Sequence, residues 1–248
     1  MTFDQKPSVK FILIDIEGTT TDIAFVKDVL FPYASDNCKE FLNKLFDEPD
    51  VKEIVRDLCK LSEEDGNPIQ KSTNKHEFIN SIVDNVKNQI KADRKTKELK
   101  NLQGKIWKEA FESGAIKGHL YDDVPRNFEK WVNQGFELYI YSSGSVEAQK
   151  LLFKYSKYGN MLKYLSGHFD TNVGHKQETQ SYKNITKELQ AKAEEILFLS
   201  DIPNEVIAAE EAGMKVTILD RPNNPLILSQ DNRKNFQVVQ NFDEIKCN

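Results

Sequence analysis

The spacing of apolar residues changes twice along the chain. Near its beginning, Phe11-Ile12-Leu13-Ile14 is an apolar run too short for an ordinary helix, which predicts a strand buried on both faces over residues 9–15. Residues 25–114 carry apolar side chains at helical spacing, and strand-like runs return only after residue 122. The chain therefore begins a sheet, leaves it for a long helical segment, and returns to it.

The helical segment predicts a small bundle. Four amphipathic helices are indicated, at residues 32–46, 49–61, 78–90 and 96–114. Pro49 suits the first turn of the second helix, Thr96 can cap the fourth helix, and Gly114 suits its end. Because no strand pattern interrupts these helices, we expect them to form one bundle.

After residue 122, strand and helix patterns alternate. Strands are predicted at 136–141, 167–170, 196–199, 215–219 and 236–239, and helices at 125–134, 146–155, 178–189 and 205–212. This alternation is typical of a parallel sheet wrapped by helices. We therefore predict an α/β fold, a Rossmann-like doubly wound parallel sheet with an inserted helical-bundle cap. The predicted core domain comprises residues 1–22 and 122–248, and the predicted cap domain comprises residues 23–121.

Composition narrows the range of partners. Hydrophobic residues make up 39% of the chain and charged residues 29%, which is ordinary for a globular protein. The net charge of −5 argues against nucleic acid and anionic membranes as partners, because both select for a basic surface. A small ligand or a protein remains open as the partner.

The cysteines and the amino terminus point to the cytoplasm. Cys38, Cys59 and Cys247 are odd in number and widely spaced, so they predict neither a disulfide framework nor a zinc site. The first residues contain no apolar segment of a secretion signal, and no apolar run approaches the ~20 residues of a membrane span. We expect a cytoplasmic protein, with the nucleus as an additional location.

Residues suited to phosphate chemistry follow the predicted strands. In doubly wound sheets, ligands bind at the carboxyl ends of the strands. The residues found there are Asp15 and Glu17 after the first strand, Ser142 and Ser143 after the second, Lys176 after the third, and Asp201 after the fourth. Carboxylates, hydroxyls, a lysine and a further carboxylate are the components of a magnesium and phosphate site.

The carboxylates predict both a metal site and catalytic groups. Mg²⁺ prefers a few oxygen ligands together with phosphate oxygens, so we predict one Mg²⁺ per chain, bound by Asp15, Glu17 and Asp201. Asp15 is the predicted nucleophile, which would attack phosphorus to give an aspartyl phosphate. Glu17 is the predicted acid and base, donating a proton to the leaving oxygen and then taking one from water.

The remaining residues predict the phosphate-binding part of the site. Ser142, and the amides of Ser143 and Gly144 at a helix amino terminus, suit phosphate oxygens. Lys176 would neutralise the phosphate charge. Ser142, Ser143 and Lys176 are therefore the predicted substrate-binding residues.

Each of these residues has a simpler interpretation on its own. An aspartate at a strand end is more often a turn former or a cap, a Ser-Ser-Gly sequence before a helix is usually a cap, and a single lysine in a loop is usually on the surface. Their occurrence after successive strands, in this order, favours a functional site.

These motifs resemble those of a known superfamily. The sequence Asp15-Ile16-Glu17-Gly18-Thr19 resembles the first motif of the haloacid dehalogenase superfamily of aspartate-nucleophile phosphatases, and Ser142, Lys176 and Asp201 stand where its second, third and fourth motifs would be. Two features depart from the usual pattern. The second acid of the first motif is Glu17 rather than aspartate, and the fourth motif offers only Glu205 as a second acid near Asp201.

The departures match one branch of that superfamily. Residues 15–21, 23–26, 30–33, 102–107 and 139–150 read DIEGTTT, IAFV, LFPY, LQGKIW and YIYSSGSVEAQK. These strings are similar to those of the methionine-salvage enolase-phosphatases, also called acireductone synthases, over residues 9–222. The resemblance implies a magnesium enzyme that enolises the small-molecule substrate 2,3-diketo-5-methylthiopentyl-1-phosphate and then removes its phosphate. It also favours a monomer.

Two alternatives are weaker. One is another small-molecule phosphomonoesterase, or a dehalogenase, of the same superfamily. The other is a non-catalytic phospho-acceptor module in which Asp15 is phosphorylated as a switch. Neither a dinucleotide-binding glycine pattern nor a P-loop occurs in the sequence, which leaves a nucleotide-binding enzyme without support.

Overall fold

The protein divides into two compact units. The computed structural model describes residues 9–222 and 224–246. The divisions fall between Ile23 and Ala24 and between Ile116 and Lys117, so that the sheet and the helical insertion are separate units. Residues 117–121, which the sequence pattern placed in the cap, cluster with the sheet unit. There the backbone N–H of Tyr121 donates to the carbonyl of Thr20 (3.0 Å).

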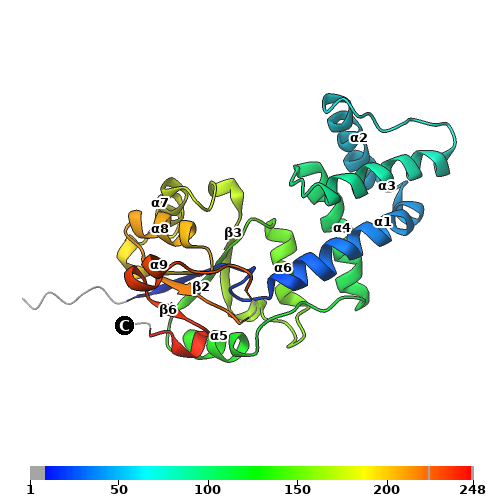
Figure 1. The fold of residues 1–248 in the computed structure, drawn as a ribbon. Coiled ribbons are helices and arrows are strands. Elements are labelled where there is room, and N and C mark those ends of the chain that lie inside the picture. Colours follow the sequence, from blue (N-terminus) through cyan, green and yellow to red (C-terminus); the bar gives the residue numbers. More distant parts are fainter. Residues whose placement is uncertain (1–8, 223, 247–248) are drawn as a thin grey trace, which may run out of the picture. The chain divides into compact units, whose positions relative to one another are not determined.

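The sheet in the described part of the chain has six strands, all parallel to their neighbours, in the order β3-β2-β1-β4-β5-β6. Figure 1 draws the strands as arrows and labels β2, β3 and β6. The strands are β1 (Phe11–Ile14), β2 (Glu137–Tyr141), β3 (Leu165–Phe169), β4 (Ile196–Ser200), β5 (Lys215–Leu219) and β6 (Val238–Val239). β1 lies between β2 and β4, and Ile12, Leu13 and Ile14 are completely buried. A central position with two buried faces explains why this strand is a continuous apolar run.

A helix of this unit precedes each of the strands β2 to β6. These helices are α5 (Asp123–Asn133), α6 (Val146–Lys154), α7 (Thr179–Glu188), α8 (Pro203–Glu211) and α9 (Gln230–Asn235). Leu13 and Phe198 from the sheet share one buried cluster with Tyr182 of α7 and Val206 of α8. The α/β fold with a helical insertion between β1 and β2 is confirmed. β3 begins two residues earlier than predicted, and α9 was not predicted.

The insertion contains the four predicted amphipathic helices. They are α1 (Phe31–Leu45), α2 (Pro49–Glu64), α3 (Lys75–Lys91) and α4 (Lys97–Ser113), around a core that includes Leu42, Leu58 and Ile82. The side chain of Thr96 accepts a hydrogen bond from the N–H of Leu99, as expected of an N-cap.

One helical segment of the insertion was not foreseen. Residues Phe25–Leu30 form a π-helix that continues directly into α1. At the junction, the indole N–H of Trp107 donates to the carbonyl of Leu30 (2.8 Å), and its ring packs on that of Phe31 at 6.0 Å between centroids. This bond connects α4 to the junction between the π-helix and α1.

No helix in residues 9–222 and 224–246 is long and apolar enough to cross a membrane.

Candidate active site

The predicted site residues of three strands meet at one edge of the sheet. Ile14 is paired with Ile140 of β2 and with Leu199 of β4, so the carboxyl ends of these strands are level. Asp15 continues the ladder, because its N–H donates to the carbonyl of Leu199 (2.9 Å). Ser142 and Asp201 therefore follow strands that flank Asp15 directly.

Lys176 lies beside the predicted nucleophile. Its ammonium group donates to Asp15 Oδ1 and lies 2.7 Å from Glu205 Oε2, and all three side chains are at most 10% exposed. The hydroxyl of Tyr182 donates to the backbone carbonyl of Lys176 (2.6 Å), which attaches this loop to α7. Burial alone would lower the pKa of Lys176, but the two carboxylates outweigh that effect and raise it. The lysine is therefore a buried, permanent positive charge.

The carboxylate of Glu205 is held in place by this ion pair and by a hydrogen bond. Besides contacting Lys176, its carboxylate accepts a hydrogen bond from the hydroxyl of Ser200 (2.8 Å). Burial and the nearby charge of Asp15 raise the pKa of Glu205 to about 7. Glu205, the second acid near the fourth motif, is thus an ion-pair partner of Lys176, a role that its sequence position alone does not show.

Asp201 has a carboxylate oxygen available for a cation. The side chain is 1% exposed, and its Oδ2 accepts a hydrogen bond from the amide of Asn224 (2.7 Å). Its Oδ1 has no hydrogen-bond partner among the described residues. Burial and the charge of Asp15 raise the pKa of Asp201 to about 7. A divalent cation between Asp15 and Asp201 would satisfy the unpaired oxygen and relieve the repulsion, so the residues present fit a metal.

The described part of the chain contains no group of three His, Cys, Asp or Glu side chains that could hold a metal. Glu17 is half-buried, and its backbone pairs with Thr21 in the tight turn after β1. The role of Glu17 as a third metal ligand therefore stays a prediction. Mg²⁺ commonly completes its octahedral coordination with waters and phosphate oxygens, so two carboxylates are compatible with a magnesium site.

The turn after β1 is fixed by its own backbone and by a buried arginine. The carbonyl of Ile16 accepts hydrogen bonds from three successive N–H groups, those of residues 19–21, at 2.9–3.2 Å. The guanidinium of Arg221, just after β5, donates twice to the carbonyl of Thr19 (2.9 and 2.7 Å) and also to the carboxylate of Asp123 (2.8 and 2.9 Å). Arg221 and Asn224 were not predicted, although both follow β5 at the same edge of the sheet.

Gly18 is required in this turn by its backbone and by its neighbour. Its φ is +72°, and a Cβ atom there would lie 2.1 Å from Asp201 Oδ2. We expect Gly18→Ala to displace the Asp201 carboxylate and to weaken Mg²⁺ binding roughly tenfold, with a backbone cost of about 1–2 kcal/mol. Titration with Mg²⁺, followed by the phosphate-release rate at saturating metal, measures the effect.

Gly66 provides the matched control, because it has the same φ of +72° and a Cβ atom added there would have nothing within 4 Å. Gly66→Ala carries the backbone cost without the steric conflict. If both variants bind Mg²⁺ equally well, Gly18 does not act through Asp201.

The loop after β2 presents Ser142. Its N–H donates to the carbonyl of Phe169 at the end of β3 (3.2 Å), and its hydroxyl oxygen accepts a hydrogen bond from the N–H of Gly144 (3.2 Å). The hydroxyl proton of Ser142 can then be donated to a phosphate oxygen. Gly144 was expected to offer its amide to phosphate, but here the Ser142 hydroxyl takes that bond. Ser143 is exposed at the tip of the loop.

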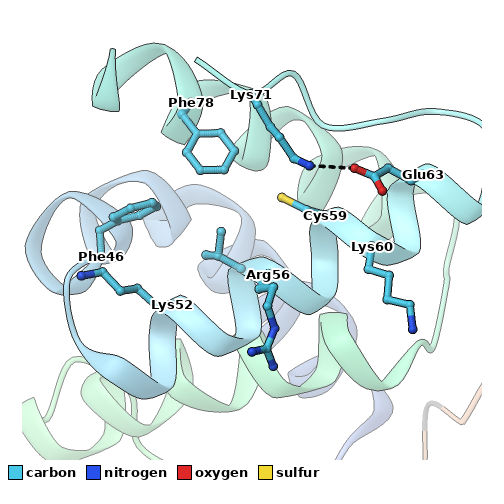
Figure 2. Close-up of a pocket in the computed structure, with 9 residues that line it drawn as sticks. Phe46, Lys52, Arg56, Cys59, Lys60, Glu63, Lys71 and Phe78 are labelled. Atoms are coloured by element: carbon cyan, nitrogen blue, oxygen red, sulfur yellow. Dashed lines mark hydrogen bonds and ion pairs between the residues drawn. The ribbon is translucent and has the colours of Figure 1, made fainter. Parts of the chain in front are cut away.

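A separate cavity of about 420 Å³ lies in the helical insertion. Figure 2 shows Phe46, Cys59 and Phe78 around it, with lysine and arginine side chains at its rim. Burial raises the pKa of the Cys59 thiol, which keeps it protonated, and Lys71 is paired with Glu63 (2.9 Å). With neither an activated nucleophile nor a carboxylate cluster, this cavity does not compete with the strand ends as the active site.

Comparison with known proteins places the chain in a family. The family model of the haloacid dehalogenase-like hydrolases matches residues 9–213. The chain is 47% identical over 245 residues to enolase-phosphatase E1 of Anopheles gambiae, covering 96% of this chain and 82% of that one. It is 45% identical over 252 residues to enolase-phosphatase E1 of Xenopus tropicalis, covering 98% and 96%.

A solved structure is also similar over nearly the whole chain. The UTR4 protein of Saccharomyces cerevisiae has 34% identity and a TM-score of 0.77, and the match covers 96% of this chain and 100% of that one. The chain therefore belongs to the haloacid dehalogenase-like hydrolases and, within them, to the enolase-phosphatase E1 family. The resemblance noted in the sequence is confirmed.

Proposed function

We propose that the protein is a bifunctional enolase-phosphatase of methionine salvage. Its substrate would be 2,3-diketo-5-methylthiopentyl-1-phosphate, and its products the acireductone 1,2-dihydroxy-3-keto-5-methylthiopentene and phosphate. The observation that carries this proposal is the buried Asp15 carboxylate, held by Lys176 beside the unpaired oxygen of Asp201, in a chain with enolase-phosphatase E1 relatives.

Phosphate transfer would begin at Asp15. A carboxylate oxygen forms a bond to phosphorus while the bond from phosphorus to the substrate oxygen breaks, which gives an aspartyl phosphate. Glu17 would protonate the leaving oxygen and would then take a proton from the water that releases phosphate. Ser142, Ser143 and Lys176 would bind the phosphate oxygens, and the fixed charge of Lys176 would stabilise the charge that develops on them.

The proposed metal is one Mg²⁺ per chain, held by Asp15 and Asp201, with Glu17 as the proposed third ligand. Haloacid dehalogenase-like hydrolases typically depend on magnesium. When bound, the ion supplies positive charge to the phosphate and to the enolate oxygen that develops as the diketone loses a proton. We further propose that the protein acts in the cytoplasm, and also in the nucleus, and that it is a monomer.

The proposal is tested by following two signals in one reaction. Absorbance reports the enol and a coupled assay reports phosphate, with the wild-type protein and the diketone phosphate, before and after addition of a chelator. We expect both signals, and the loss of phosphate release once the metal is removed. Phosphate release from other phosphate esters, with no reaction on the diketone phosphate, would indicate a different phosphatase. The absence of turnover on every ester would indicate a phospho-acceptor module.

Glu17 is proposed to contribute to enolisation, because its side chain is one methylene longer than the aspartate usual at this position. We expect Glu17→Asp to slow enol formation at least about tenfold, since a shorter side chain misplaces the proton-transferring group. Absorbance and phosphate release are measured separately. An unchanged enolisation rate in this variant would exclude the role.

A further inference from the structure

Gln149 connects three parts of the sheet unit through one buried side chain. It lies in the first turns of α6 and is 2% exposed. Its amide nitrogen donates to the carbonyls of Gly144 (2.9 Å) and Phe169 (2.8 Å), and its amide oxygen contacts His168 Nδ1 at 3.1 Å. The side chain thus joins the loop after β2, the helix that follows it, and the end of β3.

The two carbonyl partners determine the orientation of the amide. Both Gly144 and Phe169 offer acceptors, so the NH₂ group must face them and the oxygen must face His168. His168 then has to donate from Nδ1. Burial lowers the pKa of His168 to about 4, so the ring is neutral at neutral pH with its proton on Nδ1. All the hydrogen bonds of this network are therefore mutually compatible.

The same carbonyls and amides also hold Ser142. The carbonyl of Phe169 accepts from the N–H of Ser142 as well as from Gln149, and the N–H of Gly144 donates to the Ser142 hydroxyl. Gln149 therefore binds the two residues that orient Ser142. Gly144 donates to the Ser142 hydroxyl, and Phe169 accepts from the Ser142 N–H. Loss of the amide would remove the donor that holds the carbonyl of Gly144 and would leave the carbonyl of Phe169 with the N–H of Ser142, so that the loop is freer to move.

A buried amide can also be merely structural, and the same unit contains an example. Asn127 of α5 is 1% exposed, and its amide nitrogen donates to the carbonyl of Asp123 (2.9 Å) and to Asp243 (2.7 Å). Its contacts are with α5 and residue 243, whereas both acceptors of Gln149 adjoin Ser142. This difference separates a positioning role from general stabilisation.

We propose that Gln149 is a positioning residue that holds the Ser142–Gly144 loop in its phosphate-binding conformation, with His168 as the hydrogen-bond donor to its amide oxygen. The inference rests on the proposed function, because it assigns Gln149 to the phosphate-binding part of the same site.

The test replaces Gln149 with methionine, which retains the length of the side chain and removes its hydrogen bonds. In the Mg²⁺-loaded protein, we expect the affinity for inorganic phosphate to fall at least about tenfold, equivalent to one lost polar interaction. We expect kcat for phosphate release to fall about 100-fold through misplacement of Ser142. Mg²⁺ affinity without phosphate should be unchanged, because Gln149 does not contact the carboxylates.

Asn127→Leu is the matched control and should lower the melting temperature while phosphate affinity and kcat stay within about twofold of wild type. A Gln149→Met variant that behaves in the same way would overturn the inference. If the wild-type protein itself neither binds inorganic phosphate nor releases it from any ester, the proposed function fails, and this inference fails with it.

Should Gln149→Met not fold, His168 supplies a second test. His168→Leu removes the donor to the Gln149 oxygen, whereas His168→Asn keeps an N–H near the position of Nδ1. We expect weaker phosphate binding, by about 3- to 10-fold, in the leucine variant and nearly wild-type binding in the asparagine variant. Equal phosphate affinity in the two variants would contradict the proposed role.

Discussion

Replacing Asp15 with asparagine is expected to lower the rate of phosphate release by about 10⁵-fold, because the amide cannot form the covalent bond to phosphorus. The substitution preserves the size of a side chain that is 5% exposed and lies against Lys176. Loss of the buried charge also removes one partner of that lysine. Enolisation does not require the nucleophile, so enol formation should be retained in part, and the two signals should separate in Asp15→Asn.

Asp220 provides the control for this variant. It also follows a strand, β5, but it is half-buried and paired with Arg233 (2.7 Å) rather than with the Lys176 cluster. Asp220→Asn should release phosphate at close to the wild-type rate. Phosphate release within tenfold of wild type in Asp15→Asn would show that Asp15 is not the nucleophile.

Lys176→Met is expected to cost about 3–5 kcal/mol of the free energy of unfolding, because it leaves two buried carboxylates without their cation. Asp15 and Glu205 have side chains no more than 10% exposed, so water cannot replace the ammonium group. Phosphate release should also fall by several orders of magnitude. Chemical denaturation in the presence of a chelator measures the stability without any contribution from a bound metal.

The stability deficit of Lys176→Met should depend on pH in a defined direction. The pKa of Glu205 is already raised from 4.5 to about 7 by burial and by Asp15, and removal of Lys176 raises it further. A carboxyl with a raised pKa binds a proton more readily in the folded state, so folding becomes more favourable as the pH falls. Because Glu205 of the wild-type protein is itself protonated below pH 7, the deficit should shrink between pH 9 and pH 7, and adding Glu205→Gln should recover part of it at pH 7.

Lys10 offers a matched surface pair. It lies 2.6 Å from Glu195 and its side chain is 60% exposed, so Lys10→Met should change the free energy of unfolding by less than about 1 kcal/mol at either pH. A Lys176→Met variant as stable as Lys10→Met, with no pH dependence of the difference, would contradict the buried ion pair.

The sequence was sufficient for the architecture, because the architecture follows from spacing. β1 is a short apolar run since both of its faces are buried, and the four insertion helices have apolar faces at helical period. The π-helix at Phe25–Leu30 was not predicted, because its apolar spacing does not distinguish it from an α-helix, and its contact with Trp107 comes from far along the chain.

The site was predicted in its components but not in its connections. Asp15, Ser142 and Asp201 follow strands, and the parallel order of the sheet brings strand ends together. The burial of Lys176 depends on Glu205 and Tyr182, which come from helices α8 and α7, and no local pattern links them to position 176. The role proposed for Gln149 could likewise not be predicted from the sequence, because a glutamine in a helix usually faces solvent.

The most direct test of the central claim, that Asp15 carries the phosphoryl group, is a single-turnover reaction with enzyme in excess over the diketone phosphate. Samples are quenched in acid at intervals, and peptide mass analysis locates any phosphoryl adduct. We predict an adduct on the peptide that contains Asp15, formed before free phosphate appears and missing in Asp15→Asn. Phosphate release with no adduct on that peptide, or with an adduct on another peptide, would contradict the account.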